Sequence, residues 1–153
     1  MLKNALAYHQ IHSVEISWGR PVARAPYQVL IVDDSILDAC LIRHQVEDSL
    51  DRRFFAFTEV PRLIDAFELI DEMDFDLILL DLNLLDTCGL ATVSAMHAHT
   101  PFTPIVVFSS QDDPTLMAET KLCGALDFLI KGHIAPEMLK NVLQHTLTPT
   151  CYA

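Results

Sequence analysis

Basic residues are scarce in this chain, which has 10 Lys and Arg against 21 Asp and Glu and a formal net charge of −11. Affinity for the phosphate backbone of nucleic acids comes mainly from clustered Lys and Arg. We therefore expect no nucleic-acid-binding surface. A cationic protein surface or a metal ion suits this charge better.

Several patterns that mark other protein classes are also missing. No apolar run approaches the ~18 residues of a membrane-spanning helix, and residues 1–26 lack the apolar core of a signal peptide. The four cysteines include no CxxC pair, so neither a zinc site nor a thioredoxin-like motif is indicated. We expect a cytoplasmic protein without membrane insertion, whose reduced cysteines are small buried apolar residues.

Apolar residues make up 51% of the chain and charged residues 20%, which is typical of a globular protein of one domain. Residues 1–26 differ from the rest, because they are slightly basic and end in a stretch with one glycine and two prolines. We interpret them as an N-terminal extension and linker, and residues 27–150 as the domain. The extension could be a docking arm, a dimer contact or a loosely ordered tail.

From Tyr27 onward, short apolar runs alternate with helical patterns. Strands are predicted at 28–32, 54–58, 77–80, 105–108 and 126–130, and helices at about 35–47, 61–73, 90–97, 114–124 and 136–147. We expect Ser35 and Asp113 to cap two of these helices, and Pro61 to open another whose apolar face carries Leu63, Ile64, Phe67 and Ile70. Five β–α units with short connections predict an α/β fold with a five-stranded parallel sheet, doubly wound with helices on both faces.

Polar side chains follow four of these strands at the point where each strand ends. Asp33 and Asp34 follow the first, Asp81 the third, Ser109 the fourth and Lys131 the fifth. The carboxyl ends of parallel strands share one rim, where ligands bind in open α/β sheets. We therefore expect acids, a hydroxyl and an amine to converge on one chemical site.

Taken singly, each of these residues has an ordinary structural explanation. Asp33 or Asp34 alone would be a helix-capping acid. Asp81 could be a loop acid, Lys131 a solvated surface lysine and Phe128 a core residue. Only their order and spacing together favour a functional site.

The joint pattern resembles the receiver domain of two-component response regulators, a flavodoxin-like (βα)5 fold. The resemblance covers about residues 27–147. It rests on Val32-Asp33-Asp34, Leu80-Asp81-Leu82-Asn83-Leu84, Gly89, Ser109, and Phe128 with Lys131.

The resemblance implies that Asp81 is a phosphoacceptor, a carboxylate nucleophile that takes a phosphoryl group from a phosphohistidine. It also implies that Asp33, Asp34, Asp81 and the backbone carbonyl of Asn83 hold Mg²⁺. Physical chemistry points the same way, because two carboxylates ~5 Å apart at an effective dielectric of ~20 repel by about 3 kcal/mol. A divalent cation relieves that repulsion.

Further roles follow from the same resemblance. Ser109 and Lys131 would bind phosphoryl oxygens, and Phe128 would change rotamer with Ser109 as a switch. Asn83 and Gln111 would tune how long the phosphoryl group lasts, and we expect an intermediate lifetime. The protein would be no enzyme beyond its own phosphorylation and slow autodephosphorylation.

Three positions depart from the common receiver pattern. Gly132 follows Lys131 where many receivers have a cis proline, Leu85 stands where proline is common, and Ser109 replaces the more frequent threonine. A cis bond before a residue other than proline costs about 2.5–4 kcal/mol, so a trans bond at Lys131-Gly132 would hold the lysine less rigidly. These departures affect rate and rigidity, and no required functional group is lost.

The expected partners are a sensor histidine kinase or a histidine phosphotransfer protein, and a downstream protein target. The predicted last helix ends shortly before the chain does, so we expect a stand-alone receiver that acts through protein contacts. A homodimer is a further possibility, although helix 136–147 has only Lys140 and no arginine for a charge-paired interface.

Three other functions were weighed. The main alternative is a pseudo-receiver, a phosphorylation-independent interaction module. An aspartyl-phosphate phosphatase would need a second acid at Asn83, and a flavin site would need a phosphate-cradling loop. A metal site at His97 and His99 is disfavoured, because residues two apart do not share a helix face.

Overall fold

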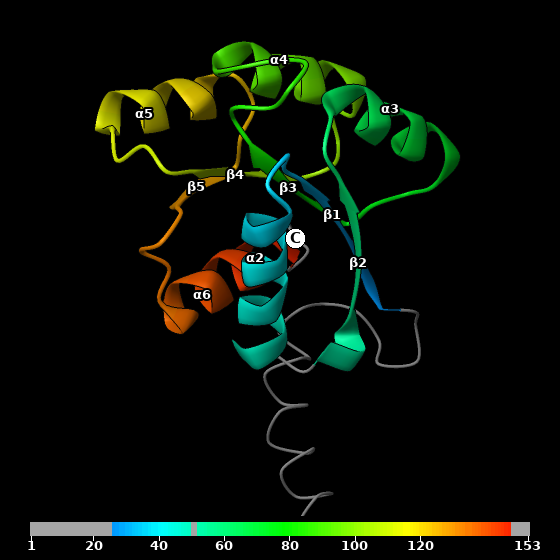
Figure 1. Ribbon diagram of the computed structural model, residues 1–153, viewed down its shortest axis with the longest axis vertical. Helices are drawn as coiled ribbons and strands as arrows, with labels where there is room; N and C mark the ends of the chain where they lie inside the picture. The colour runs from blue at the N-terminus through cyan, green and yellow to red at the C-terminus, as the bar shows by residue number, and fades with distance from the viewer. Residues whose placement is uncertain (1–25, 50–51, 148–153) are drawn as a thin grey trace, which may run out of the picture.

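The computed structural model describes residues 26–49 and 52–147, and these residues form one five-stranded parallel sheet (Figure 1). The strands are β1 (Tyr27–Val32), β2 (Phe55–Val60), β3 (Leu77–Asp81), β4 (Ile105–Ser109) and β5 (Asp127–Ile130). Their spatial order is β2-β1-β3-β4-β5, with every pair parallel. The predicted fold class is confirmed.

Helices cover both faces of the sheet (Figure 1). Helices α2 (Ile36–Ser49) and α6 (Pro136–Leu147) lie on one face, and α3 (Leu63–Glu72), α4 (Leu90–His99) and α5 (Pro114–Leu122) lie on the other. A single 3₁₀ turn, η2 (Arg52–Phe54), leads into β2. Among the described residues, no helix combines the length and apolar character needed to cross a bilayer.

Successive side chains of the central strands point to opposite faces of the sheet, and they form one hydrophobic core on each face. In β1, Val29 and Ile31 pack with residues of α2 and α6, whereas Leu30 and Val32 pack with residues of α3 and α4. Because both faces of the strand are covered, every position from Val29 to Val32 is apolar and almost fully buried. This double burial is why the sequence shows continuous apolar runs that end abruptly in polar residues.

The beginning of α3 differs from the prediction. We expected Pro61 to open this helix, but α3 begins at Leu63, where two backbone N–H groups donate to the side chain of Asp86. We also expected Ile64 on the buried face, and this was wrong: Ile64 is 48% exposed, and Ala66 takes the buried position.

The predicted caps of two other helices are confirmed. The Asp113 side chain accepts from the N–H of Thr115 at 2.9 Å, immediately before α5. The Ser35 hydroxyl accepts from the N–H of Asp38 at 3.2 Å at the start of α2. These caps fix the first turns that leave the carboxyl ends of β1 and β4.

The cysteines are less buried than predicted. Cys88 is exposed, so its interpretation as a buried apolar residue was wrong, and Cys40 and Cys123 are half-buried. Cys151 and residues 1–25 of the predicted extension lie outside the described residues.

Candidate functional site

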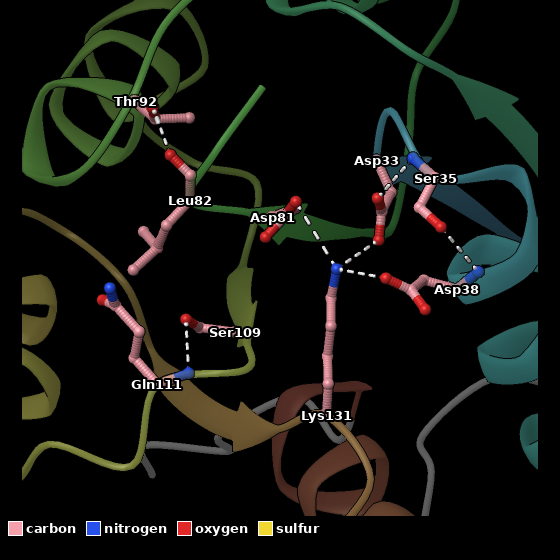
Figure 2. A network of polar contacts seen from close by, with 9 residues as sticks. All are labelled: Asp33, Ser35, Asp38, Asp81, Leu82, Thr92, Ser109, Gln111 and Lys131. Carbon is pink, nitrogen blue, oxygen red and sulfur yellow. Dashed lines mark hydrogen bonds and ion pairs between the residues drawn. The ribbon is translucent and has the colours of Figure 1, made fainter. Parts of the chain in front are cut away.

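The parallel topology brings the carboxyl ends of four strands to one rim. Val32 pairs with Leu80 in register, and Ser109 pairs with Ile130. The polar residues that end these strands therefore lie level with one another, and Figure 2 shows the side chains of Asp33, Asp81, Ser109 and Lys131 gathered there. The predicted convergence of acid, hydroxyl and amine is present in the structure.

Three carboxylates form an acidic cluster at this rim. Asp33, Asp34 and Asp81 each offer an oxygen, and these oxygens lie within 4.8 Å of one another. Asp33 and Asp81 are buried, each 7% exposed, whereas Asp34 is exposed. Buried oxygen donors of like charge that lie this close together fit a hard divalent cation such as Mg²⁺, which also tolerates an open side for water.

Lys131 crosses the rim and bonds to the acids (Figure 2). Its Nζ donates to Asp33 Oδ2 at 2.8 Å and to Asp38 Oδ2 at 3.0 Å, and lies 3.4 Å from Asp81 Oδ2. The lysine side chain is 15% exposed. It therefore neutralises part of the acidic cluster from the side of β5.

Asp38 was missed by the sequence analysis. It lies in the first turn of α2, and it contacts Lys131 across 93 positions of the chain. The only available signal was an acid placed one helical turn beyond Asp33-Asp34, close to the same rim. An acid at a helix beginning is common for other reasons, because it interacts favourably with the helix dipole.

The two charged groups at the centre of the site have shifted pKa values. Burial raises the pKa of Asp81 to about 6, although the charge of Lys131 and the N–H of Asn83 act to lower it. Burial acts to lower the pKa of Lys131, but hydrogen bonds to Asp33 and Asp38 outweigh it, and the pKa of Lys131 is raised overall. Lys131 therefore stays charged at neutral pH, whereas the pKa of Asp81 lies close to neutral pH.

Ser109 connects the ends of β4 and β5. Its side chain is almost fully buried, and its hydroxyl accepts from the N–H of Gln111 at 3.1 Å. Its carbonyl accepts from the N–H of Lys131 at 2.8 Å. A displacement of Ser109 would therefore pull on the strand that carries Lys131.

The remaining predicted residues surround this centre. Phe128 is buried in the core on the sheet face covered by α3, α4 and α5, whereas the side chains of Asn83 and Gln111 are exposed. The described residues contain no cis peptide bond, so the Lys131-Gly132 bond is trans, and Gly132 has φ +82°. At that φ a glycine is the residue that fits without strain.

The loop after Asp81 is closed by its own hydrogen bonds. The N–H of Gly89 donates to the carbonyl of Leu82 at 2.8 Å, and the Thr92 hydroxyl donates to the same carbonyl at 3.1 Å (Figure 2). Gly89 has φ +66°, which lets the chain turn back into α4. These bonds tie the loop that carries Asn83 to the beginning of α4.

Comparison with known sequences identifies the family. The sequence model of the response regulator receiver domain matches residues 29–144. A chemotaxis protein CheY of Listeria monocytogenes is 26% identical over 74% of this chain and 92% of its own length. The swarming motility regulation protein RssB of Serratia marcescens is 32% identical over 74% of this chain and half of its own length.

A two-component response regulator-like protein, APRR3 of Arabidopsis thaliana, is 29% identical over 85% of this chain. This chain spans about a quarter of that protein, since the match covers 26% of its length.

Solved structures lead to the same family. Chemotaxis response regulator CheY4 of Vibrio cholerae superposes with a TM-score of 0.64 at 29% identity, over 80% of this chain and 99% of that chain. A two-component response regulator of Clostridium difficile superposes with a TM-score of 0.68 at 21% identity, over 79% of this chain and 95% of that chain, which shows the shared fold. This chain belongs to the response regulator receiver domain family.

Proposed function

We propose that this receiver domain accepts a phosphoryl group on Asp81 from a phosphohistidine donor in the presence of Mg²⁺, and that it signals through protein contacts. The observation that supports this is the position of Asp81, a buried carboxylate beside two further acids and 3.4 Å from the Lys131 ammonium. A buried, incompletely paired carboxylate at an open rim is a nucleophile that an anionic donor can reach once charge is balanced.

The transfer is a displacement at phosphorus. An ionised oxygen of Asp81 forms the new P–O bond while the P–N bond of phosphohistidine breaks, and the electron pair returns to the imidazole. Bound at Asp33, Asp34, Asp81 and the backbone carbonyl of Asn83, Mg²⁺ would supply the positive charge that offsets repulsion between carboxylate and phosphoryl oxygens.

Lys131 and Ser109 bind the transferred group in this mechanism. Lys131 turns its ammonium from the carboxylates to a phosphoryl oxygen, as a mobile point charge. Ser109 donates its hydroxyl hydrogen to another oxygen, and its Oγ can at the same time accept from the Gln111 N–H. The buried Phe128 follows Ser109, so that a charge of up to about −2 at one residue changes the surface near β5.

The partners follow from the same chemistry. A sensor histidine kinase or a histidine phosphotransfer protein would supply the phosphoryl group, and a downstream protein would read the phosphorylated surface. The names of the relatives, which include chemotaxis and two-component proteins, support this assignment. We place the receiver domain at residues 27–150 and the protein in the cytoplasm, as a signalling module and not as an enzyme with its own turnover.

Incubation with Mg²⁺ and acetyl phosphate, followed by intact-protein mass spectrometry, tests the proposal. We expect addition of one phosphoryl group, which Asp81→Asn and chelation of Mg²⁺ both abolish. Asp112→Asn is the matched control, because Asp112 is an exposed acid in the β4–α5 loop, and it should be labelled like the wild type. Labelling of Asp81→Asn would contradict the proposal, and no labelling by any donor would favour the phosphorylation-independent interaction module.

The two exposed residues Asn83 and Gln111 flank the path of a water that would attack the phosphoryl group. We propose that they set its lifetime, and that this lifetime is intermediate. Exchange of both side chains for residues of other size and polarity should change the rate of phosphoryl loss. A dephosphorylation rate that both exchanges leave unchanged would overturn this role.

A further inference from the structure

Lys131 is held from the α2 side of the site by an acid that is neither phosphoacceptor nor proposed metal ligand. Its Nζ lies 3.0 Å from Asp38 Oδ2 and 2.8 Å from Asp33 Oδ2, but 3.4 Å from Asp81 Oδ2. In Figure 2 Asp38 lies on one side of the ammonium and Ser109 on the other. The lysine is therefore drawn toward α2, away from the hydroxyl with which it would share a phosphoryl group.

A ring of hydrogen bonds fixes Asp38 in this position (Figure 2). Asp33 Oδ1 accepts from the N–H of Ser35 at 2.9 Å, and the Ser35 hydroxyl accepts from the N–H of Asp38 at 3.2 Å. Lys131 closes the ring by donating to Asp38 and back to Asp33. The cap thus fixes the backbone of Asp38 in the first turn of α2, and from there its carboxylate reaches Lys131.

The lysine side chain borders a pocket on one side. Asp38, Lys131 and Gly132 line a pocket of about 100 Å³ between α2 and the β5–α6 connection. This space borders the Lys131–Asp38 ion pair on the α2 side. The position of the lysine ammonium is set mainly by the charges it contacts.

An ammonium group has three N–H donors, of which Asp33 and Asp38 each accept one, while Asp81 lies at ion-pair distance. In the proposed function Asp33 binds Mg²⁺, and the negative charge at Asp81 moves outward onto the phosphoryl oxygens. Asp38 takes part in neither step, and its carboxylate stays beside the lysine. It is therefore the acid that competes with a phosphoryl oxygen for Lys131 throughout.

We propose that Asp38 is a positioning residue that restrains Lys131 on the α2 side of the site, and so limits how readily this lysine turns to a phosphoryl group on Asp81. This inference rests on the proposed function. It assigns the restraint to an acid of α2, so the strength of phosphoryl binding would depend on the first turn of that helix.

Binding of beryllofluoride, a phosphoryl analogue, tests the inference by calorimetry at saturating Mg²⁺. Asp38→Asn keeps the shape of the side chain and removes its charge, and we expect about three- to tenfold tighter binding, the scale of one partly buried ion pair. Asp38→Glu keeps the charge and should restore binding to within about twofold of the wild type. Asp48→Asn, which removes an exposed acid near the far end of α2, is the matched control and should bind like the wild type. Unchanged or weaker binding by Asp38→Asn would overturn the inference.

A double-mutant cycle separates restraint of the lysine from plain repulsion of the anion. In a Lys131→Met background, we expect the effect of Asp38→Asn to fall below about twofold, because the lysine through which Asp38 acts is gone. An undiminished effect would mean that Asp38 repels beryllofluoride directly, and would overturn the inference. If the wild type binds no beryllofluoride and takes no label from acetyl phosphate, the proposed function fails as well. If acetyl phosphate labels the wild type normally but Asp38→Asn binds beryllofluoride no more tightly than the wild type, only the positioning role of Asp38 is overturned.

Discussion

The two buried acids of the rim are distinguished by their distance from Lys131. Asp33 and Asp81 are equally buried, at 7% exposure each, but the ammonium lies 2.8 Å from Asp33 Oδ2 and 3.4 Å from Asp81 Oδ2. Asp81 is therefore as buried as Asp33, but the positive charge of Lys131 compensates its carboxylate less. This imbalance supports the proposal that Asp81 is the nucleophile, since the carboxylate of Asp81 is less firmly engaged than that of Asp33.

The raised pKa of Asp81 makes stability depend on pH. Folding raises this pKa from 3.8 to about 6, so the folded protein favours the protonated acid. The associated stability is complete below pH 3.8 and is lost as the pH rises through about 6. Without divalent ions, we expect Asp81→Asn to be more stable than the wild type at about pH 7, by roughly 1–3 kcal/mol.

Urea unfolding of both proteins between about pH 4.5 and about pH 7.5 measures this difference. The gap between Asp81→Asn and the wild type should widen across that interval, because only the wild type titrates at this position. A gap that stays constant with pH would show that the substitution acts through packing and not through ionisation.

At the scale of secondary-structure elements, Asp86 links the loop after β3 to the beginning of α3. Its two carboxylate oxygens accept from the N–H groups of Leu63 and Ile64, both at 3.0 Å. Although burial works to raise the pKa of Asp86, these N–H bonds outweigh it and lower that pKa. Asp86 thus performs the role of a helix cap from another element.

Removal of this cap should destabilise the protein measurably. We expect Asp86→Ala to lower the free energy of unfolding by about 1 kcal/mol, the usual loss for a capping side chain. Hydrogen exchange of the first-turn amides of α3 should accelerate in parallel. Asp74→Ala, which removes an exposed acid beyond the other end of α3, serves as the control and should change neither quantity. Equal loss in both variants would argue against a specific cap.

Gly124, between α5 and β5, lies against His97 at the end of α4. A Cβ added at Gly124 would overlap the His97 side chain, with Cγ as the nearest atom, and φ at this glycine is +118°. We expect Gly124→Ala to destabilise the protein by about 2–4 kcal/mol, through the clash and the backbone strain together.

Gly132→Ala is a matched comparison for Gly124→Ala in thermal unfolding. Gly132 also has a positive φ, at +82°, but a Cβ there would meet no atom within 4 Å. Gly132→Ala should lower the free energy of unfolding only by the backbone strain, about 1 kcal/mol. Similar losses at both glycines would mean that the contact with His97 is not what excludes a side chain.

The elements that could be predicted from the sequence are those whose cause is local. β1 and β3 are buried on both faces, so their apolar runs and the acids that end them are visible directly in the chain. The Asp113 cap of α5 is likewise a contact between near neighbours.

What sequence reasoning missed depends on contacts between distant residues. Asp86 lies 23 positions from Leu63, and it shifts the beginning of α3 from the predicted Pro61 to Leu63. Asp38 lies 93 positions from Lys131, and its contribution to the site exists only once α2 and β5 are assembled. The strand ends supplied the positions of the five expected rim residues and the resemblance to receivers supplied their roles, but neither pointed to Asp38.

At the scale of the whole molecule, acids outnumber bases by 21 to 10, and the sheet topology gathers three of these acids at one rim. Repulsion within such a charge distribution weakens the folded state, and monovalent salt relieves it in a general way. A divalent ion that binds the folded rim specifically adds a second contribution, because an ion that binds only the folded state stabilises it by mass action.

We therefore expect Mg²⁺ to raise the thermal midpoint of the wild-type protein, and the free energy of unfolding to rise by about 1.4 kcal/mol for each tenfold increase in Mg²⁺ above its dissociation constant. NaCl at matched ionic strength should stabilise less, because it screens charge without occupying the rim. Asp33→Asn removes a buried proposed ligand and should abolish the difference between the two salts, while Asp74→Asn, an exposed acid outside the rim, should keep it. Equal stabilisation of the wild type by both salts, or a full Mg²⁺ response in Asp33→Asn, would contradict a divalent site formed by Asp33, Asp34 and Asp81.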